Sequence, residues 1–130
     1  MILDVNTIDQ LENNISNHLI AVIFFIERDS DMCNELLGRI KLELIPHLRE
    51  IEGVILMKIS SDCEIDFFEH FNINEVPTTL VFYKGKHVSF FEQDKEENMY
   101  KTDRFIGNDP DLPNKLFRFI LHLYKRFDKK

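Results

Sequence analysis

The chain has 130 residues, 44% of them apolar, and a net charge of −7 from 23 acidic and 16 basic side chains. This length suits one folded unit with one hydrophobic core, so we expect a single domain over residues 1–130. A surface of that sign repels phosphate backbones and anionic lipids. We therefore expect neither a nucleic acid nor a membrane among the partners of this protein.

Only two cysteines are present, Cys33 and Cys63. They are too few for the disulfide framework of a small secreted protein, and they cannot form a four-ligand zinc site, so we expect no bound metal. The longest apolar run, Leu19 to Ile26, is too short to cross a bilayer and does not resemble a signal peptide. These features predict a cytoplasmic location, with the nucleus as the alternative.

The first elements read clearly from the residue pattern. Ile2 to Val5 is extended, and a helix is predicted over residues 7–16, where Thr7 and Gln10 have the spacing of a capping box. Leu19 to Ile26 is apolar on both faces, which is typical of a strand in the middle of a sheet that carries helices on each side.

A second helix follows a short polar stretch. Apolar residues recur every three or four positions from Cys33 to Leu48, which predicts an amphipathic helix that starts near Asp31 or Met32. Pro46 should end or kink this helix because proline lacks a backbone N–H.

The next segment predicts a strand and a short helix. The strand covers Val54 to Ile59, and Asp62 is positioned to cap the helix that follows. The inward face of that helix is expected to carry Ile65, Phe68 and Phe71.

The last part of the chain predicts a hairpin, a loop and a helix. Thr78 to Tyr83 is a strand, Lys84-Gly85 a tight turn, and Lys86 to Phe91 the antiparallel partner. Residues 92–103 show no periodicity and predict an exposed loop insertion. The final helix runs from Asp111 to about Phe127. The whole order predicts an α/β fold, with a central mixed β-sheet flanked by helices on both faces.

This order resembles the thioredoxin fold, and two local motifs support the resemblance. Glu75-Val76-Pro77-Thr78, followed by an apolar strand and a Lys-Gly turn, is similar to the cis-proline loop of that superfamily. Phe24-Phe25 lies eight residues before Cys33, which places Cys33 at the second cysteine of the Cys-x-x-Cys motif. The resemblance covers nearly the whole chain except residues 92–103.

A narrower resemblance is to the thioredoxin-like N-terminal domain of multidomain monothiol glutaredoxins. Those domains also have a Phe-Phe strand end, a single cysteine at the second motif position, and a Gly-x-x-x-x-Leu segment before the last helix. Here that segment runs from Gly107 to Leu112.

The departures from the superfamily pattern concern the active site itself. The motif reads Ser30-Asp31-Met32-Cys33, so a serine stands in the place of the attacking cysteine. Asp29 stands where the superfamily has Trp, and Phe24 stands where it buries an acid. Lys58 matches the lysine near that acid, but it is expected to lack its partner.

These departures limit the chemistry that the resemblance implies. Dithiol exchange needs an exposed thiolate that attacks and a second thiol that resolves the mixed disulfide, and a serine hydroxyl cannot do either. The helix start favours a thiolate at Cys33, whereas burial and the acids at positions 29 and 31 oppose it. Three roles for Cys33 stay open: a buried apolar residue, a monothiol that reacts with glutathione, or a metal or iron–sulfur ligand in a dimer.

The resemblance implies a protein-binding or adaptor module in redox or iron–sulfur homeostasis that lacks the dithiol site. The alternative is a monothiol oxidoreductase in which Cys33 reacts with glutathione or a partner thiol. A third alternative is a structural subunit with an unused groove. The first function needs no cofactor, and the second uses glutathione. In either case a protein partner or peptide segment is expected to bind a groove next to Ser30 and Cys33, whose other residues are Asp31, Met32, Val76, Pro77, Thr78 and Gly107.

Overall fold

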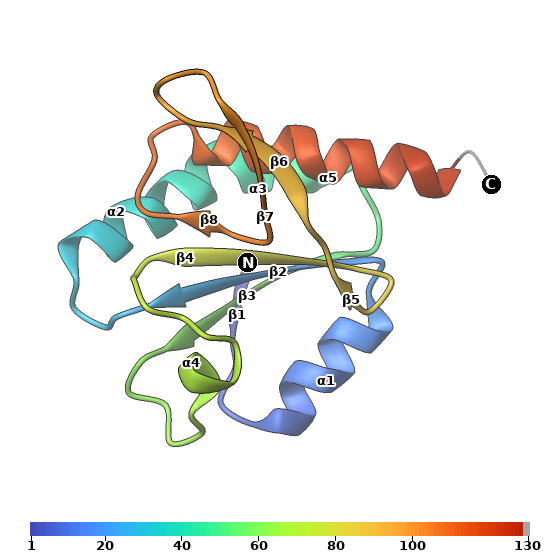
Figure 1. Cartoon of the computed structure of the whole chain (residues 1–130). Coiled ribbons are helices and arrows are strands. Elements are labelled where there is room, and N and C mark those ends of the chain that lie inside the picture. Colours follow the sequence, from blue (N-terminus) through green and yellow to red (C-terminus); the bar gives the residue numbers. More distant parts are fainter. Residues whose placement is uncertain (129–130) are drawn as a thin grey trace.

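A computed structural model describes residues 1–128 of the chain and shows a twisted mixed sheet (Figure 1). The strands lie in the order β1-β3-β2-β4-β5, and β8 also pairs with β4. Strands β1, β2 and β3 are parallel, whereas β4 is antiparallel to β2, β5 and β8. Their bounds are β1 (Ile2–Asp4), β2 (Ile20–Ile26), β3 (Val54–Ser60), β4 (Thr78–Tyr83), β5 (Lys86–His87) and β8 (Phe105–Ile106).

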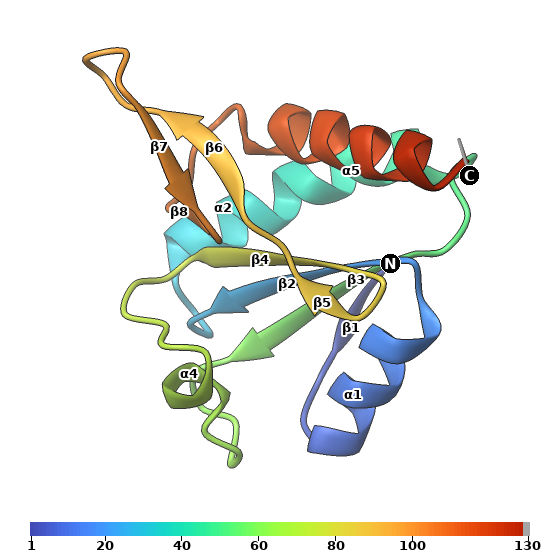
Figure 2. The same ribbon diagram turned by 45° about the vertical axis from the view of Figure 1, so that its right-hand side comes forward.

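Helices cover both faces of this sheet, which confirms the predicted fold class. One face packs against α2 (Asp31–Arg39), the π-helical turn η1 (Ile40–Leu44), α3 (Ile45–Leu48) and α5 (Leu112–Asp128). The other face carries α1 (Ile8–Asn17) and the short α4 (Phe67–His70) (Figure 2). Within residues 1–128, no helix is both long enough and apolar enough to span a bilayer.

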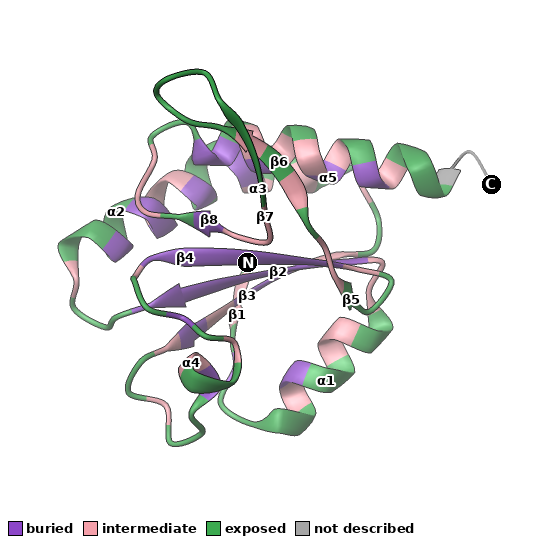
Figure 3. Ribbon diagram, in the orientation of Figure 1, coloured by how far each residue is buried: buried purple, intermediate pink, exposed green. Residues whose placement is uncertain are grey.

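Strand β2 is the centre of the molecule, as its two-sided apolar pattern predicted. All seven of its residues are buried (Figure 3). Because side chains alternate along a strand, Phe24 lies in the core beneath α2 and α5, whereas Phe25 lies in the core beneath α1 and α4. The sheet therefore separates two hydrophobic clusters.

The helix that begins at Asp31 does not end before Pro46. It widens into η1, where the Ile45 N–H donates to the Ile40 carbonyl five residues earlier. Pro46 then occupies the first turn of α3, where its missing N–H costs little, and the helix continues to Leu48. The π-helical turn thus accommodates the proline within a continuous helical segment.

The helix after β3 begins later than the sequence predicted. Its cap is Asp66, whose carboxylate accepts a hydrogen bond from the Glu69 N–H at 3.0 Å. Asp62 instead forms an exposed ion pair with Arg28 at 2.9 Å, so its predicted capping role was wrong. The residue that α4 buries is Phe67, whereas Ile65 is 37% exposed.

The hairpin partner of β4 is shorter than predicted. Lys84 and Gly85 both have positive φ values, of 52° and 80°, and form the expected tight turn. However, only Lys86–His87 pairs with β4 beyond it. The other half of the same β4 edge is occupied by β8, a strand that the sequence analysis missed.

Residues 92–103 are not a loop, and this prediction was wrong. Strands β6 (Phe90–Gln93) and β7 (Met99–Thr102) form a separate antiparallel hairpin that projects from the body (Figure 2). At its tip the Asp94 carboxylate accepts hydrogen bonds from the N–H groups of Glu96 and Asn98, both at 2.9 Å. Most of its side chains face solvent, so no apolar alternation marks these strands in the sequence.

Candidate functional site: three loops at the end of the sheet

Pairing within the sheet brings three loops together. Phe25 near the end of β2 lies opposite Thr78 at the start of β4, and Thr78 lies opposite Ile106 in β8. The segments that follow or precede these strands carry Ser30, Pro77 and Gly107. They lie at the same end of the sheet in both ribbon views (Figures 1 and 2).

The loop before β4 has a defined backbone geometry. The Val76–Pro77 peptide bond is cis, and Pro77 is buried. Its carbonyl accepts a hydrogen bond of 2.8 Å from the Gly107 N–H, which joins two predicted groove residues. The Thr78 hydroxyl donates to the Glu75 carbonyl at 2.7 Å. Within residues 1–128, the backbone N–H and carbonyl of Val76 have no backbone hydrogen-bond partner.

Ser30 is the N-cap of α2. Its backbone is extended, and its hydroxyl accepts a hydrogen bond from the Cys33 N–H at 3.3 Å. The Ser30 carbonyl accepts from the Asn34 N–H at 2.9 Å, so the helix begins immediately after the serine. Asp31 is exposed and Met32 is 47% exposed, so both point their side chains towards solvent.

Cys33 lies inside the core beneath α2. Its exposed fraction is 0%, and the Glu27 N–H donates to its Sγ at a distance of 3.5 Å. Both cysteines are free thiols. Cys63 packs against the hydrophobic cluster on the opposite face of the sheet, so the sheet separates the two residues.

The interior beneath this site contains no acid at the position of Phe24, which is fully buried. Lys58 lies opposite Phe24 in β3, as the superfamily resemblance implied. As expected, it lacks the acid that the superfamily buries there, and its Nζ lies instead 3.7 Å from the Asp4 carboxylate in β1. The lysine therefore pairs with the edge strand of the sheet and away from the thiol.

A polar network that the sequence analysis missed holds the segment after β8. The Arg39 guanidinium donates to the side-chain and main-chain oxygens of Asn108, and the Asn108 amide donates to Glu35 at 3.4 Å. In α5, the Lys115 ammonium lies 2.9 Å from the Asp109 carboxylate and 3.5 Å from the Glu92 carboxylate. These residues are far apart in the sequence, so no spacing pattern signals their contact.

The same network shifts two pKa values. The hydrogen bond from Lys115 lowers the pKa of the Asp109 carboxyl below its usual value of 3.8, against a smaller opposing effect of burial. That hydrogen bond also raises the pKa of Lys115 above 10.5. Glu92 therefore links the projecting hairpin to α5 through a lysine that remains charged at neutral pH.

The site therefore offers a hydroxyl in a capping hydrogen bond, a covered thiol and an open loop backbone. Within residues 1–128, no three His, Cys, Asp or Glu side chains gather as a metal would require. The class of the fold is clear from the sheet order, from the helix that starts directly after the central strand, and from the proline loop beside it. It is the thioredoxin fold.

Comparison with solved structures agrees with this class. The chain is similar to oxidised thioredoxin from Plasmodium falciparum, with a TM-score of 0.67 and 14% identity over 92% of this chain and 98% of that chain. Malassezia sympodialis thioredoxin is similar with a TM-score of 0.65 and 19% identity, over 95% of this chain and 91% of that chain. Trypanosoma brucei brucei thioredoxin is similar with a TM-score of 0.64 and 20% identity, over 92% of this chain and 91% of that chain. No protein-family model matches the sequence. No curated protein matches it.

Proposed function

We propose that this chain is a thioredoxin-like protein-binding module that lacks dithiol chemistry and acts in redox or iron–sulfur homeostasis. Its proposed setting is that of the thioredoxin-like N-terminal domain of multidomain monothiol glutaredoxins, which its sequence resembles. The observation that carries the proposal is the burial of Cys33 behind Ser30, since the serine hydroxyl caps α2 and the thiol has no exposed surface. A thiol that a substrate disulfide cannot reach is a poor nucleophile.

The loop before β4 supports a role in binding an extended segment. The free N–H and carbonyl of Val76 can pair with a partner strand, while Pro77 and Gly107 support the loop from behind. Exposed apolar side chains lie on the elements that begin or end here: Ile106, which pairs with Thr78, is 56% exposed, and Met32, in the first turn of α2, is 47% exposed. Such side chains are typical of the contact surface for a peptide.

The charge at this end of the sheet favours a basic partner. Asp29 and Asp31 are both exposed beside Ser30, and neither forms an ion pair within residues 1–128. A segment with an apolar side chain for the groove and a lysine or arginine beside it would match both features.

One observation favours a second function, that of a monothiol oxidoreductase. Cys33 is a free thiol in the first turn of α2, and its Sγ accepts a hydrogen bond from the Glu27 N–H in the turn that covers it. After opening of the turn at residues 27–30, Cys33 would lose its proton to solvent and attack glutathione disulfide. A mixed disulfide with Cys33 would form, and one glutathione thiolate would leave.

Thiol reactivity separates the two functions. In a Cys63→Ser background, the rate of alkylation of Cys33 is measured as a function of pH, in the native chain and in the urea-unfolded chain. The same protein is then assayed for insulin reduction with dithiothreitol present. The binding module predicts alkylation at least about a hundredfold slower in the native chain, because the thiol reacts only after local opening, and no turnover of insulin. Fast native alkylation near neutral pH together with turnover would reject the binding module in favour of the monothiol enzyme.

The groove itself is tested with selected peptides. Peptides selected from a random library are titrated against the chain and followed by amide chemical shifts. We expect shifts at Val76 and Ile106, and loss of binding in Ile106→Glu. Phe91→Glu is the matched control, because Phe91 is also an exposed apolar residue, at 66% against 56% for Ile106, and lies on the hairpin. Shifts confined to the hairpin, or binding that survives Ile106→Glu, would contradict the proposed groove.

A further inference from the structure

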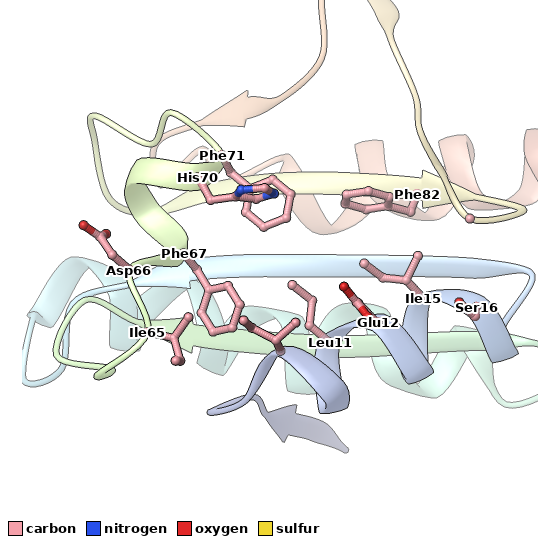
Figure 4. Close-up of a pocket in the computed structure, with 12 residues that line it drawn as sticks. Leu11, Glu12, Ile15, Ser16, Ile65, Asp66, Phe67, His70, Phe71 and Phe82 are labelled. Atoms are coloured by element: carbon pink, nitrogen blue, oxygen red, sulfur yellow. The ribbon is translucent and has the colours of Figure 1, made fainter.

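A cavity lies on the sheet face opposite Cys33. It has a volume of about 660 Å³ and is bounded by α1, by α4 with the residues before it, and by the end of β4 (Figure 4). Small-molecule sites in proteins have volumes of about 300–1,000 Å³. This cavity is therefore large enough for a ligand of one or two rings.

Apolar side chains form most of its wall. The buried ones are Leu11, Phe67 and Phe82, with exposed fractions of 5%, 3% and 7%. Ile8 lines the same cavity but is 49% exposed, so apolar surface continues to the mouth. Burial of an aromatic or aliphatic ligand here would remove apolar surface of both partners from water.

The cavity is also lined by the carboxylate of the exposed Glu12, with His70 as the basic residue of its wall. Figure 4 shows that the Glu12 carboxylate points from α1 into the cavity, whereas the Asp66 carboxylate points away and caps α4. No lysine or arginine lines the cavity, and Glu12 has no ion-pair partner within residues 1–128. A carboxylate beside apolar walls attracts a positively charged group.

We propose that this cavity is a binding site for a small amphiphilic cation, with an aromatic or aliphatic body against Phe67 and Phe82 and an amine beside Glu12. The sheet separates this site from Cys33, and neither Ser30 nor Pro77 lines the cavity. It does not depend on the function proposed for the groove, and either proposal can fail without the other.

Three probes that share one apolar body test the charge preference: 2-(2-naphthyl)ethylamine, 2-(2-naphthyl)ethanol and 2-naphthylacetate. Each is titrated against the chain, and binding is followed by amide chemical shifts. We expect the amine to shift amides of α1, α4 and Phe82, and to bind about fivefold more tightly than the alcohol, as a partly exposed ion pair allows. The acetate should bind most weakly.

Variants assign this preference to the cavity. Glu12→Gln should make the amine and the alcohol bind equally, whereas Glu97→Gln, at the exposed tip of the hairpin, should leave the fivefold ratio unchanged. Ile8→Arg places a cation at the mouth and should abolish binding of the amine. Ile8 is half exposed and the first residue of α1, so the fold should tolerate this change, which far-UV circular dichroism checks.

Four results would overturn the proposal. The first two are the absence of binding by all three probes at millimolar concentration, and equal affinity for the amine and the acetate. The other two are amide chemical shifts confined to the loops near Pro77, and an amine-to-alcohol affinity ratio that Glu12→Gln leaves unchanged. Because the groove residues are untouched by these variants, such a result would not alter the outcome of the thiol or peptide experiments.

Discussion

The hydroxyl of Ser30 accepts a hydrogen bond from the backbone N–H of Cys33 at 3.3 Å. A helix cap thus joins Ser30 to Cys33, three residues later in the chain. The serine stabilises the start of α2, and under the proposed function it also takes the place of the sulfur that begins thiol exchange.

Loss of this cap should weaken the fold. Ser30→Ala removes the acceptor for the Cys33 N–H, and we expect a decrease of about 1 kcal/mol in the free energy of unfolding, measured with urea. Ser89→Ala is the matched control, because Ser89 is exposed, lies between strands and caps no helix. Equal effects of the two substitutions would show that the capping bond contributes nothing.

Restoring the missing sulfur should restore only part of the activity of a dithiol protein. In Ser30→Cys, a thiol regains the attacking position, but Phe24 still provides no carboxylate for proton transfer to or from Cys33. Positioned acid–base groups contribute about 10²–10⁴-fold in rate. We therefore expect insulin reduction that is measurable but about a hundredfold slower than that of a dithiol thioredoxin assayed in parallel. A rate equal to that of the thioredoxin would refute the importance of Phe24.

The ion pair between Asp109 and Lys115 should give a stability difference that depends on pH. Because the pKa of Asp109 is lowered in the folded state, its contribution to the free energy of unfolding is present above pH 3.8. That contribution is lost as the pH falls through the pKa of the folded state. The raised pKa of Lys115 means that its contribution is present below pH 10.5 and is lost as the pH rises through the folded value.

The measurement compares Asp109→Asn with the unmodified chain by urea unfolding from pH 2 to pH 8. We expect the variant to be less stable at neutral pH and the difference to shrink below pH 3.8. Glu50→Gln serves as control, since Glu50 is exposed and forms no ion pair within residues 1–128. A difference that stays constant across this range would contradict the assignment.

Arg104 should be sensitive to a change that preserves its charge. Its guanidinium donates to the carbonyls of Phe71 and Asn72, at 3.2 and 2.9 Å, and its side chain is only 18% exposed. Lysine cannot reproduce this forked geometry, so Arg104→Lys should lower the free energy of unfolding by about 1–2 kcal/mol. Arg28→Lys is the control, because the Arg28–Asp62 pair is largely exposed, and its effect should be smaller. Equal effects would mean that the carbonyl contacts of Arg104 do not stabilise the fold.

The sequence could predict the elements whose side chains enter the core. Leu19 to Ile26 is apolar at every position because β2 is covered on both sides, and that pattern is visible without any knowledge of its neighbours. The same is true of the stripe that includes Cys33 and Leu36 on α2, both fully buried. Burial imposes a periodicity that a single chain segment displays by itself.

Elements whose partners come from distant segments could not be predicted in this way. In the hairpin of β6 and β7 most side chains are exposed, and Phe90 packs against Phe105 and Phe119 from distant segments, so no local pattern signals this pairing. Strand β8 is two residues long and exists because β5 leaves half of the β4 edge free. Asp62 was the predicted cap, whereas the helix begins after Asp66, where Phe67 enters the core.

The amino-acid sequence alone determined that Ser30 lies three residues before Cys33, and that a central apolar strand leads into the helix carrying Cys33. Only the tertiary structure decided that this thiol has no exposed surface, that Lys58 pairs with Asp4, and that the Gly107 N–H holds the Pro77 carbonyl. The reason is physical: residue identity and periodicity are local properties, whereas exposure and pairing depend on which distant segments the sheet brings together.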